Sequence, residues 1–166
     1  MRPIAIGEVW LRLVGKCAMA VGADLGKRMA PLQMGVGVSG GAQCVGHAVK
    51  AGIAAHPDHV KLQINCKNAF NSLFRTSMLR AIATAATPLL PLATLMYSEA
   101  SPLLVLGASR TATSSWSKQG VRQGDPCGPL FFALTVQPIF QSLSETFPGV
   151  RIIAYLDDIV LPRPGS

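Results

Sequence analysis

Two adjacent aspartates, Asp157 and Asp158, stand between the largely apolar stretches 150–154 and 159–161 near the carboxyl end of the chain. Two strand-length runs separated by so short a polar segment predict a β-hairpin with both carboxylates at its tip. Adjacent carboxylates repel each other and are costly to bury, so the pair is best suited to binding a hard divalent cation. Aspartate is also an ordinary turn residue, and the segment Tyr155 to Asp158 therefore needs support from the rest of the sequence.

The hydrophobic pattern of the remaining chain predicts a mixed α+β domain. A short buried strand is expected at residues 60–64, which places Asn65 at its carboxyl end. This strand is expected to lie beside the hairpin in one antiparallel sheet, backed by helices at 71–84 and 129–147. A second hairpin is expected from strands at 103–106 and 111–116. Further helices are expected at 9–23 and through Ala55, with Phe74, Met78 and Ile82 on one face of the 71–84 helix and a kink at Pro138.

The segment Gly35 to Gly40 matches the G-x-G-x-x-G pattern of dinucleotide-binding folds and precedes an expected helix, which Ser39 is placed to cap. The surroundings do not fit that interpretation. No buried strand precedes Gly35, and Asp58 comes before the next strand instead of after it. The glycines are therefore interpreted as a loop that closely approaches template or substrate.

Three segments resemble, in order and spacing, the three palm motifs of reverse transcriptases, most closely those of non-LTR retrotransposons. They are residues 62–72, 119–134 and 155–158. The start of the chain, Arg2-Pro3-Ile4, and the segment 33–47 resemble the later part of the fingers. The resemblance implies an α+β reverse-transcriptase-like palm at 60–166, with an antiparallel sheet backed by helices, after partial fingers at 1–59. No thumb is expected within the chain.

The first motif departs from the family pattern at the position that matters most for catalysis. In the family this motif opens with an aspartate five residues before an aromatic residue, whereas here Asn65 stands five residues before Phe70. The resemblance therefore implies a catalytic set of Asp157, Asp158 and the replacement Asn65, with the two aspartates as metal ligands. An amide oxygen adds no negative charge, so a two-ion Mg²⁺ site is expected to be weakened. Asn65 could also cap the strand end by a backbone hydrogen bond, and the two roles are compatible.

The resemblance further assigns nucleotide-binding roles outside the carboxylates. Phe70 occupies the position of the sugar gate, an aromatic ring that packs against deoxyribose and excludes a 2′-hydroxyl. Arg122, Gln123 and Gly124 match the motif that lines the nucleotide and template pocket, and Arg2 matches a triphosphate contact. From the residues alone, Phe70 is more often a core residue, and residues 119–129 are an ordinary Gly-Pro loop entering a helix.

Charge and cysteine content narrow the class of partner. Residues 1–80 carry ten Lys/Arg and three Asp/Glu, whereas residues 81–166 carry five of each, within a net charge of +7. A basic half beside an acidic turn suits a polyanion and a metal, although a solvated basic face explains the charge equally well. The cysteines lack zinc-ligand spacing and are interpreted as reduced thiols of an intracellular protein. No targeting signal is evident, the resemblance makes a nuclear location conceivable, and prolines interrupt the uncharged stretch 81–98, so no membrane partner is expected.

The expected activity is RNA-templated DNA synthesis, with an RNA template, a DNA primer and deoxynucleoside triphosphates as partners. Asn65 and the missing thumb predict an impaired or inactive fragment. Two alternatives stay open at this point. The chain could be a non-catalytic nucleic-acid-binding remnant of a retroelement, or a relic that barely folds. Primer extension separates the first alternative from the enzyme, and thermal unfolding tests the second.

Overall fold

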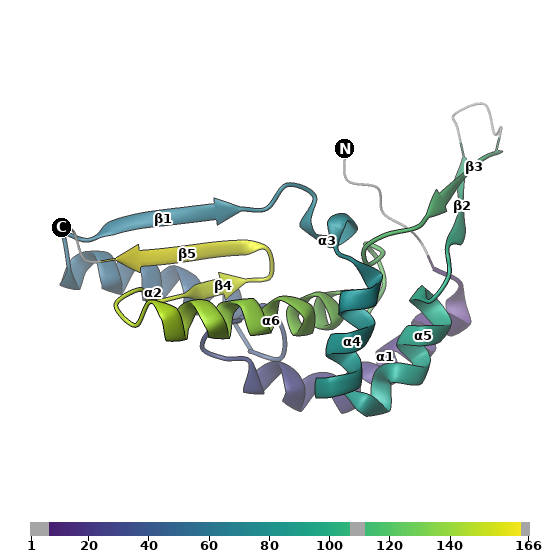
Figure 1. The fold of residues 1–166 in the computed structure, drawn as a ribbon, viewed down its shortest axis with the longest axis horizontal. Coiled ribbons are helices and arrows are strands. Elements are labelled where there is room, and N and C mark those ends of the chain that lie inside the picture. The colour runs from purple at the N-terminus through teal and green to yellow at the C-terminus, as the bar shows by residue number, and fades with distance from the viewer. Residues whose placement is uncertain (1–6, 107–111, 164–166) are drawn as a thin grey trace.

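The computed structural model of the protein describes residues 7–106 and 112–163 (Figure 1). The helices are α1 (Val9–Arg28), α2 (Gly41–Ala55), α3 (Ala69–Ser72), α4 (Arg75–Ala85), α5 (Leu90–Tyr97) and α6 (Gly128–Thr146), with a short 3-10 turn, η1 (Thr87–Leu89), before α5. The strands are β1 (Val60–Asn65), β2 (Ser101–Leu106), β3 (Ala112–Ser117), β4 (Ile153–Tyr155) and β5 (Asp158–Arg163). The α+β composition with antiparallel sheets agrees with the sequence prediction. Within the described residues, no helix has the length and apolarity needed to cross a membrane.

The carboxyl-terminal hairpin forms as predicted and lies beside the predicted strand. β5 is central in a three-stranded antiparallel sheet of order β1-β5-β4, and residues 156–157 connect β4 to β5. The prediction that β1 is buried is wrong, because β1 is an edge strand with Val60 63% and Leu62 55% exposed.

Two helices cover the sheet. Phe140 of α6 forms a small core with Ile152 and Ala154, and α2 lies against β4 and β5. The predicted 71–84 helix does not back the sheet in this way. It is divided into α3 and α4, and α4 packs against α6 and α5, away from the strands (Figure 1). Phe74, expected on its buried face, precedes α4 and is 69% exposed.

The main core lies between α1, α4, α5 and the first half of α6. It is built around side chains that are almost completely buried: Met78, Ile82, Tyr97, Val121, Cys127, Leu130 and Phe131. α1 extends five residues beyond the predicted end at residue 23, to Arg28. It approaches α6 closely at Gly22, where an added Cβ would lie 2.6 Å from a Leu130 methyl carbon. The long α1 is therefore fixed by packing as well as by its own periodicity.

Two further predictions concern element ends. β2 and β3 pair as the predicted second hairpin, and the residues between them, 107–111, lie outside the described residues. α2 begins and ends close to the predicted limits, but Ser39 does not cap it. The residue before its first turn is Gly40, in the left-handed region with φ +64°, and no side chain caps the helix there. A glycine tolerates this conformation without the strain that a Cβ would cause.

Thiol reactivity should separate the four cysteines. Cys17, Cys44 and Cys66 are exposed, whereas Cys127 is buried and donates a hydrogen bond to the Gly15 carbonyl oxygen over 3.4 Å. Burial, and secondarily the charge of Asp125, raises the pKa of the Cys127 thiol to about 12, so almost no thiolate is present at pH 8. We expect Ellman's reagent at pH 8 to titrate three thiols rapidly in the folded protein and the fourth only after denaturation. A fourth rapid equivalent without denaturant would contradict this packing.

Candidate functional site

The tip of the β4–β5 hairpin brings together the three residues predicted to form the catalytic set. In the antiparallel register, Asn65 of β1 is paired with Asp158 of β5. Paired residues of antiparallel strands carry their side chains on the same face, with Cβ atoms about 4.5–5.5 Å apart. Asp157 precedes Asp158 in the turn and is partly buried, whereas Asp158 and Asn65 are exposed. The end of one strand and the tip of a hairpin thus meet at one point.

The donor set at this point fits a hard cation. Among the described residues, Lys27 forms an ion pair with Asp24 on α1. No ion pair of this part of the chain involves Asp157 or Asp158. The described residues also show no backbone hydrogen bond from the Asn65 side chain, so the predicted strand-end cap is absent there. Within residues 7–106 and 112–163, two carboxylates and an amide oxygen are thus available to a ligand. Oxygen ligands of this kind are the ones that Mg²⁺ and Ca²⁺ prefer.

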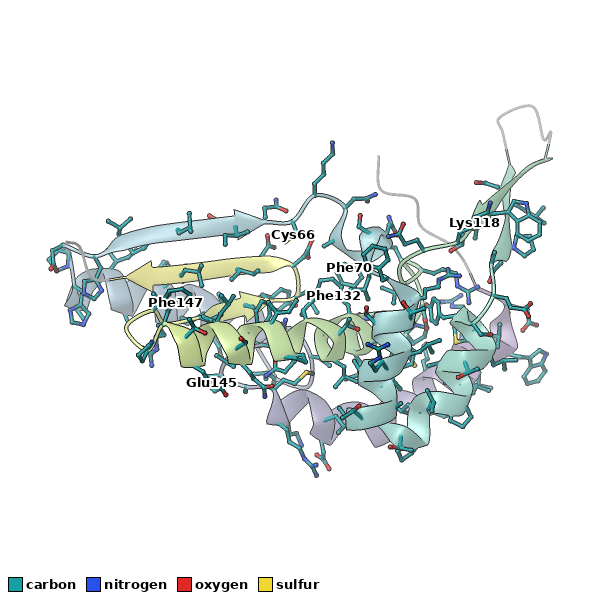
Figure 2. All side chains as sticks on the ribbon, viewed as in Figure 1. Cys66, Phe70, Lys118, Phe132, Glu145 and Phe147 are labelled. Carbon is teal, nitrogen blue, oxygen red and sulfur yellow. The ribbon has the colours of Figure 1, made fainter. Side chains whose placement is uncertain are left out.

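Phe70 lies close to this point in a partly buried position. Its ring stacks on Phe132 of α6, with ring centroids 4.5 Å apart and planes 11° from parallel, and Figure 2 shows the two rings between α3 and α6. The stacking supports the interpretation of Phe70 as a core residue. One face of the ring is occupied by Phe132, so the sugar-gate role stays a prediction for the rest of the ring.

The glycine-rich loop that follows β3 is seated on α3. The Val121 N–H donates to the Phe70 carbonyl oxygen over 2.8 Å, and the Gln119 side chain donates to the Ser72 carbonyl over 2.8 Å. At Gly120, with φ +68°, an added Cβ would lie 2.3 Å from the same Phe70 oxygen. Only glycine permits so close a contact between the two backbones. The first and second motifs are therefore physically joined.

Beneath the loop, a buried tyrosine organises its polar groups. The Tyr97 hydroxyl donates to Asp125 Oδ2 and accepts from the Arg122 N–H over 3.2 Å, while Asp125 Oδ1 accepts from the Cys127 N–H over 3.0 Å. Burial, followed by the charge of Asp125, raises the pKa of Tyr97, so its hydroxyl stays a proton donor. The sequence patterns did not single out Tyr97 or Asp125, because the partners lie 28 residues apart.

The residues predicted to contact nucleotide have different environments. The Arg122 guanidinium donates to the Met96 carbonyl oxygen over 3.0 Å and lies 5.1 Å from the centroid of the Tyr97 ring, so part of its donor capacity is used within the protein. Gln123 is partly buried, and Gly124 is exposed with φ +110°. Arg2 lies outside the described residues. The nucleotide contacts of all four residues remain predictions.

A second group of metal-ligand residues lies away from the carboxylates. His56, Asp58 and His59 bring one ligand atom each within 4.8 Å of one another, just before β1 begins and thus at the opposite end of that strand from Asn65. The two imidazole rings stack at 4.2 Å with planes 9° from parallel. Lone pairs in parallel ring planes do not converge on one ion, so this cluster is not arranged for metal binding.

Comparisons with known proteins agree with the sequence resemblance. Residues 1–163 match the family model described as reverse transcriptase (RNA-dependent DNA polymerase). The retrotransposable element SLACS 132 kDa protein of Trypanosoma brucei gambiense is 28% identical over 170 residues, which cover 98% of this chain and 14% of that protein. The chain thus spans only a small part of the length of this relative.

Solved structures of telomerase share the fold. Telomerase from Candida albicans, in complex with a fragment of telomeric RNA, superposes with a TM-score of 0.62 at 12% identity, covering 95% of this chain and 31% of that chain. Apo telomerase from Candida tropicalis, truncated from its C-terminal domain, gives a TM-score of 0.55 at 12% identity, with 94% of this chain and 34% of that chain covered. At this identity the likeness concerns the fold alone.

Proposed function

Because this chain belongs to the reverse transcriptase family, whose members copy a nucleic-acid template with nucleotide substrates and divalent metal ions, we propose that it is the palm and part of the fingers of an RNA-templated DNA polymerase from a non-LTR retrotransposon. The similarity to the SLACS protein supports the retrotransposon origin. The observation that carries the proposal is the pairing of Asn65 with Asp158 beside Asp157. We also propose a division into partial fingers at 1–59 and palm at 60–166, and an intracellular location for the polymerase.

The proposed reaction is the attack of a primer 3′-hydroxyl on the α-phosphate of a deoxynucleoside triphosphate. A new phosphorus–oxygen bond forms, the bond to the β-phosphate oxygen breaks, and pyrophosphate leaves. When bound, Mg²⁺ supplies charge stabilisation for the entering and leaving oxygens. Asp157 and Asp158 would hold the ions, with the amide oxygen of Asn65 in the third position. The backbone of the 119–124 loop and the ring of Phe70 would position the nucleotide.

The proposed activity is impaired in this chain. Replacing one of three carboxylates by an amide removes a negative charge from the position where cations must accumulate. The exposure of Asn65 and Asp158 lets water compete for the ions, which further weakens the site. We therefore expect the parent protein to extend a primer slowly or not at all, with the fault lying in metal binding and not in the fold.

Primer extension on an RNA template tests the proposal directly. The parent protein, Asn65→Asp and Asn65→Asp with Asp157→Ala would be compared at equal concentrations with Mg²⁺ and one labelled deoxynucleotide. Addition by Asn65→Asp at a rate at least about a hundredfold above the other two supports a shared carboxylate site. Equal rates in all three proteins would reject polymerase chemistry at this turn. Addition of ribonucleotides as readily as deoxynucleotides would remove the sugar-gate role of Phe70.

A second candidate function is nucleic-acid binding without catalysis, which Asn65 and the basic amino-terminal half both favour. In this case affinity comes from phosphate contacts, and it should be weak, salt-sensitive and indifferent to sequence. With about four phosphate contacts, we expect roughly a hundredfold loss of affinity between 50 and 200 mM salt, measured by fluorescence anisotropy with a labelled oligonucleotide.

Matched lysine variants locate the contacts. Lys67 is exposed and follows β1 directly, whereas Lys27 is bonded to Asp24 on α1 over 3.0 Å. Lys67→Gln should reduce the slope of log affinity against log salt by about one unit, and Lys27→Gln should leave the slope unchanged. Tight binding that does not change between the two salt concentrations would contradict binding through phosphate contacts. It would also contradict the placement of Lys67 on the binding surface.

A further inference from the structure

Gln33 is the most deeply buried polar residue near the carboxylate turn, with 0% of its surface exposed. It belongs to the segment between α1 and α2, 123 residues away in sequence from the turn that it contacts. Its Oε1 accepts from the Leu156 N–H over 2.7 Å and from the Gly35 N–H over 2.9 Å, and its Nε2 donates to the Leu156 carbonyl oxygen over 3.3 Å. The one side chain therefore satisfies both backbone groups of Leu156.

Leu156 needs this support because its backbone is strained. It has φ +57°, a left-handed conformation that strains a residue with a Cβ and persists only where the surroundings enforce it. Leu156 is also the residue that immediately precedes Asp157. Any relaxation of its backbone therefore changes the direction in which the Asp157 carboxylate leaves the turn.

The segment that carries Gln33 is itself attached to the hairpin. It forms a parallel bridge with Ala154, in which the Met34 N–H donates to the Ala154 oxygen over 2.8 Å and the Ala154 N–H donates to the Leu32 oxygen over 2.9 Å. At Gly35 an added Cβ would lie 2.8 Å from the Leu156 nitrogen, so the segment is in direct contact with the turn. The segment therefore covers the edge of β4 that does not pair with β5, and the bridge to Ala154 holds Gln33 beside Leu156.

From these contacts we infer that Gln33 is a positioning residue, which fixes the strained turn so that Asp157 and Asp158 are presented to a divalent cation. The side-chain polar atoms of Gln33 are bonded to the backbone of Leu156 and Gly35, so Gln33 acts on the carboxylates through the backbone of the turn. The effect on metal binding rests on the proposed function, whereas the effect on the turn does not. Any change in the 31–35 segment would reach the carboxylates by this route.

Amide hydrogen exchange, read residue by residue by NMR, tests the effect on the turn. In the parent protein the Leu156 and Gly35 amides should exchange slowly, since both are bonded to the buried Gln33 oxygen. Gln33→Met, which keeps the length of the side chain and removes its polar atoms, should speed exchange at both amides by about tenfold or more. Gln33→Glu keeps the accepting oxygen and should preserve most of the protection.

Gln137 provides a matched control. It is also a buried glutamine, with 9% of its surface exposed, but its Nε2 donates to the Met29 oxygen over 3.4 Å and its Oε1 has no partner among the described residues. The Met29 oxygen also accepts from the Gln33 N–H over 3.0 Å, so Gln137→Met removes a buried amide beside the same segment whose described hydrogen bond goes to Met29 and not to Leu156 or Gly35. It should leave exchange at Leu156 and Gly35 unchanged, whatever it does to global stability.

The metal-linked effect is measured as the rise in thermal midpoint caused by 10 mM Mg²⁺ in the Asn65→Asp protein. Adding Gln33→Met should reduce that rise to less than half, and adding Gln137→Met should not. Faster exchange with an undiminished rise would overturn the positioning role while leaving the proposed function intact. If Mg²⁺ does not raise the thermal midpoint of Asn65→Asp itself, the result counts against the proposed function. The exchange measurement then tests alone whether Gln33 fixes the turn.

If Gln33→Met does not fold, the parent protein and Gln33→Glu test the positioning role. Rapid exchange of Leu156 and Gly35 in the unaltered protein, at rates typical of an open turn, would overturn that role without any variant. If Gln33→Met does fold, exchange at these amides equal to that in Gln137→Met would overturn it as well. Slow exchange in the parent together with protection kept in Gln33→Glu would support it.

Discussion

Asn65→Asp should turn a protein whose thermal midpoint barely responds to Mg²⁺ into one that Mg²⁺ clearly stabilises. The substitution adds a carboxylate with almost no change in volume, at the position paired with Asp158. Without Mg²⁺ the variant should be less stable than the parent, because three carboxylates then repel one another at one point. Mg²⁺ binds only the folded state, so 10 mM of the ion at a Kd near 1 mM contributes about 1.4 kcal/mol.

For a chain of this size, that free energy corresponds to a rise of about 3–6 °C in the thermal midpoint. Differential scanning fluorimetry with and without Mg²⁺ measures it, and Asp157→Ala in the same background should abolish the extra rise. Asn71→Asp is a matched control, since it places a similar charge on α3, where the Asn71 side chain bonds Asn68 over 3.1 Å. Equal Mg²⁺ responses in the parent, Asn65→Asp and the double variant would mean that the site is not assembled, and non-catalytic binding would then be the better explanation.

The local parts of this fold could be predicted because local sequence determines them. The apolar stretches on either side of Asp157 and Asp158 and the Gly128-Pro129 helix start each specify one element within a few residues, and both elements form. The pairing of β1 with β5 followed from the need to bring Asn65 and the aspartates to one place. The requirement for a shared metal site therefore predicted a pairing of strands that no local sequence pattern indicates.

The incorrect predictions share a different cause. The exposure of β1 and the position of α4 depend on which neighbours pack against each element, and hydrophobic periodicity describes only the element itself. Gln33 was missed for the same reason, since its partner Leu156 lies 123 residues away and a glutamine has no distinctive pattern. A buried glutamine is recognised as a positioning residue only once the groups that bond its side-chain oxygen and nitrogen are located.

Arg75→Met should destabilise the fold by roughly 3 kcal/mol, because a nearly buried guanidinium makes hydrogen bonds that no apolar side chain can replace. Its nitrogens donate to the Gly120 oxygen over 3.1 Å, to the Glu99 oxygen over 2.9 Å and to Ser117 Oγ over 2.7 Å. These acceptors flank the base of the β2–β3 hairpin and the loop after it. Arg75 thus connects α4, the hairpin and the second palm motif.

The expected loss is read from urea unfolding, with Arg80→Met as the matched control. Arg80 lies five residues later on the same helix and is exposed, so its replacement should change the free energy of unfolding by less than about 0.5 kcal/mol. Amide exchange should also quicken at Gly120 and Val121 in Arg75→Met, whereas it should stay unchanged at Leu156, which depends on Gln33. If Arg75→Met unfolds at the same urea concentration as Arg80→Met, the buried network does not hold the loop. The 119–124 loop would then have to be positioned by the contacts of Gly120 and Val121 with α3 and its flanking residues.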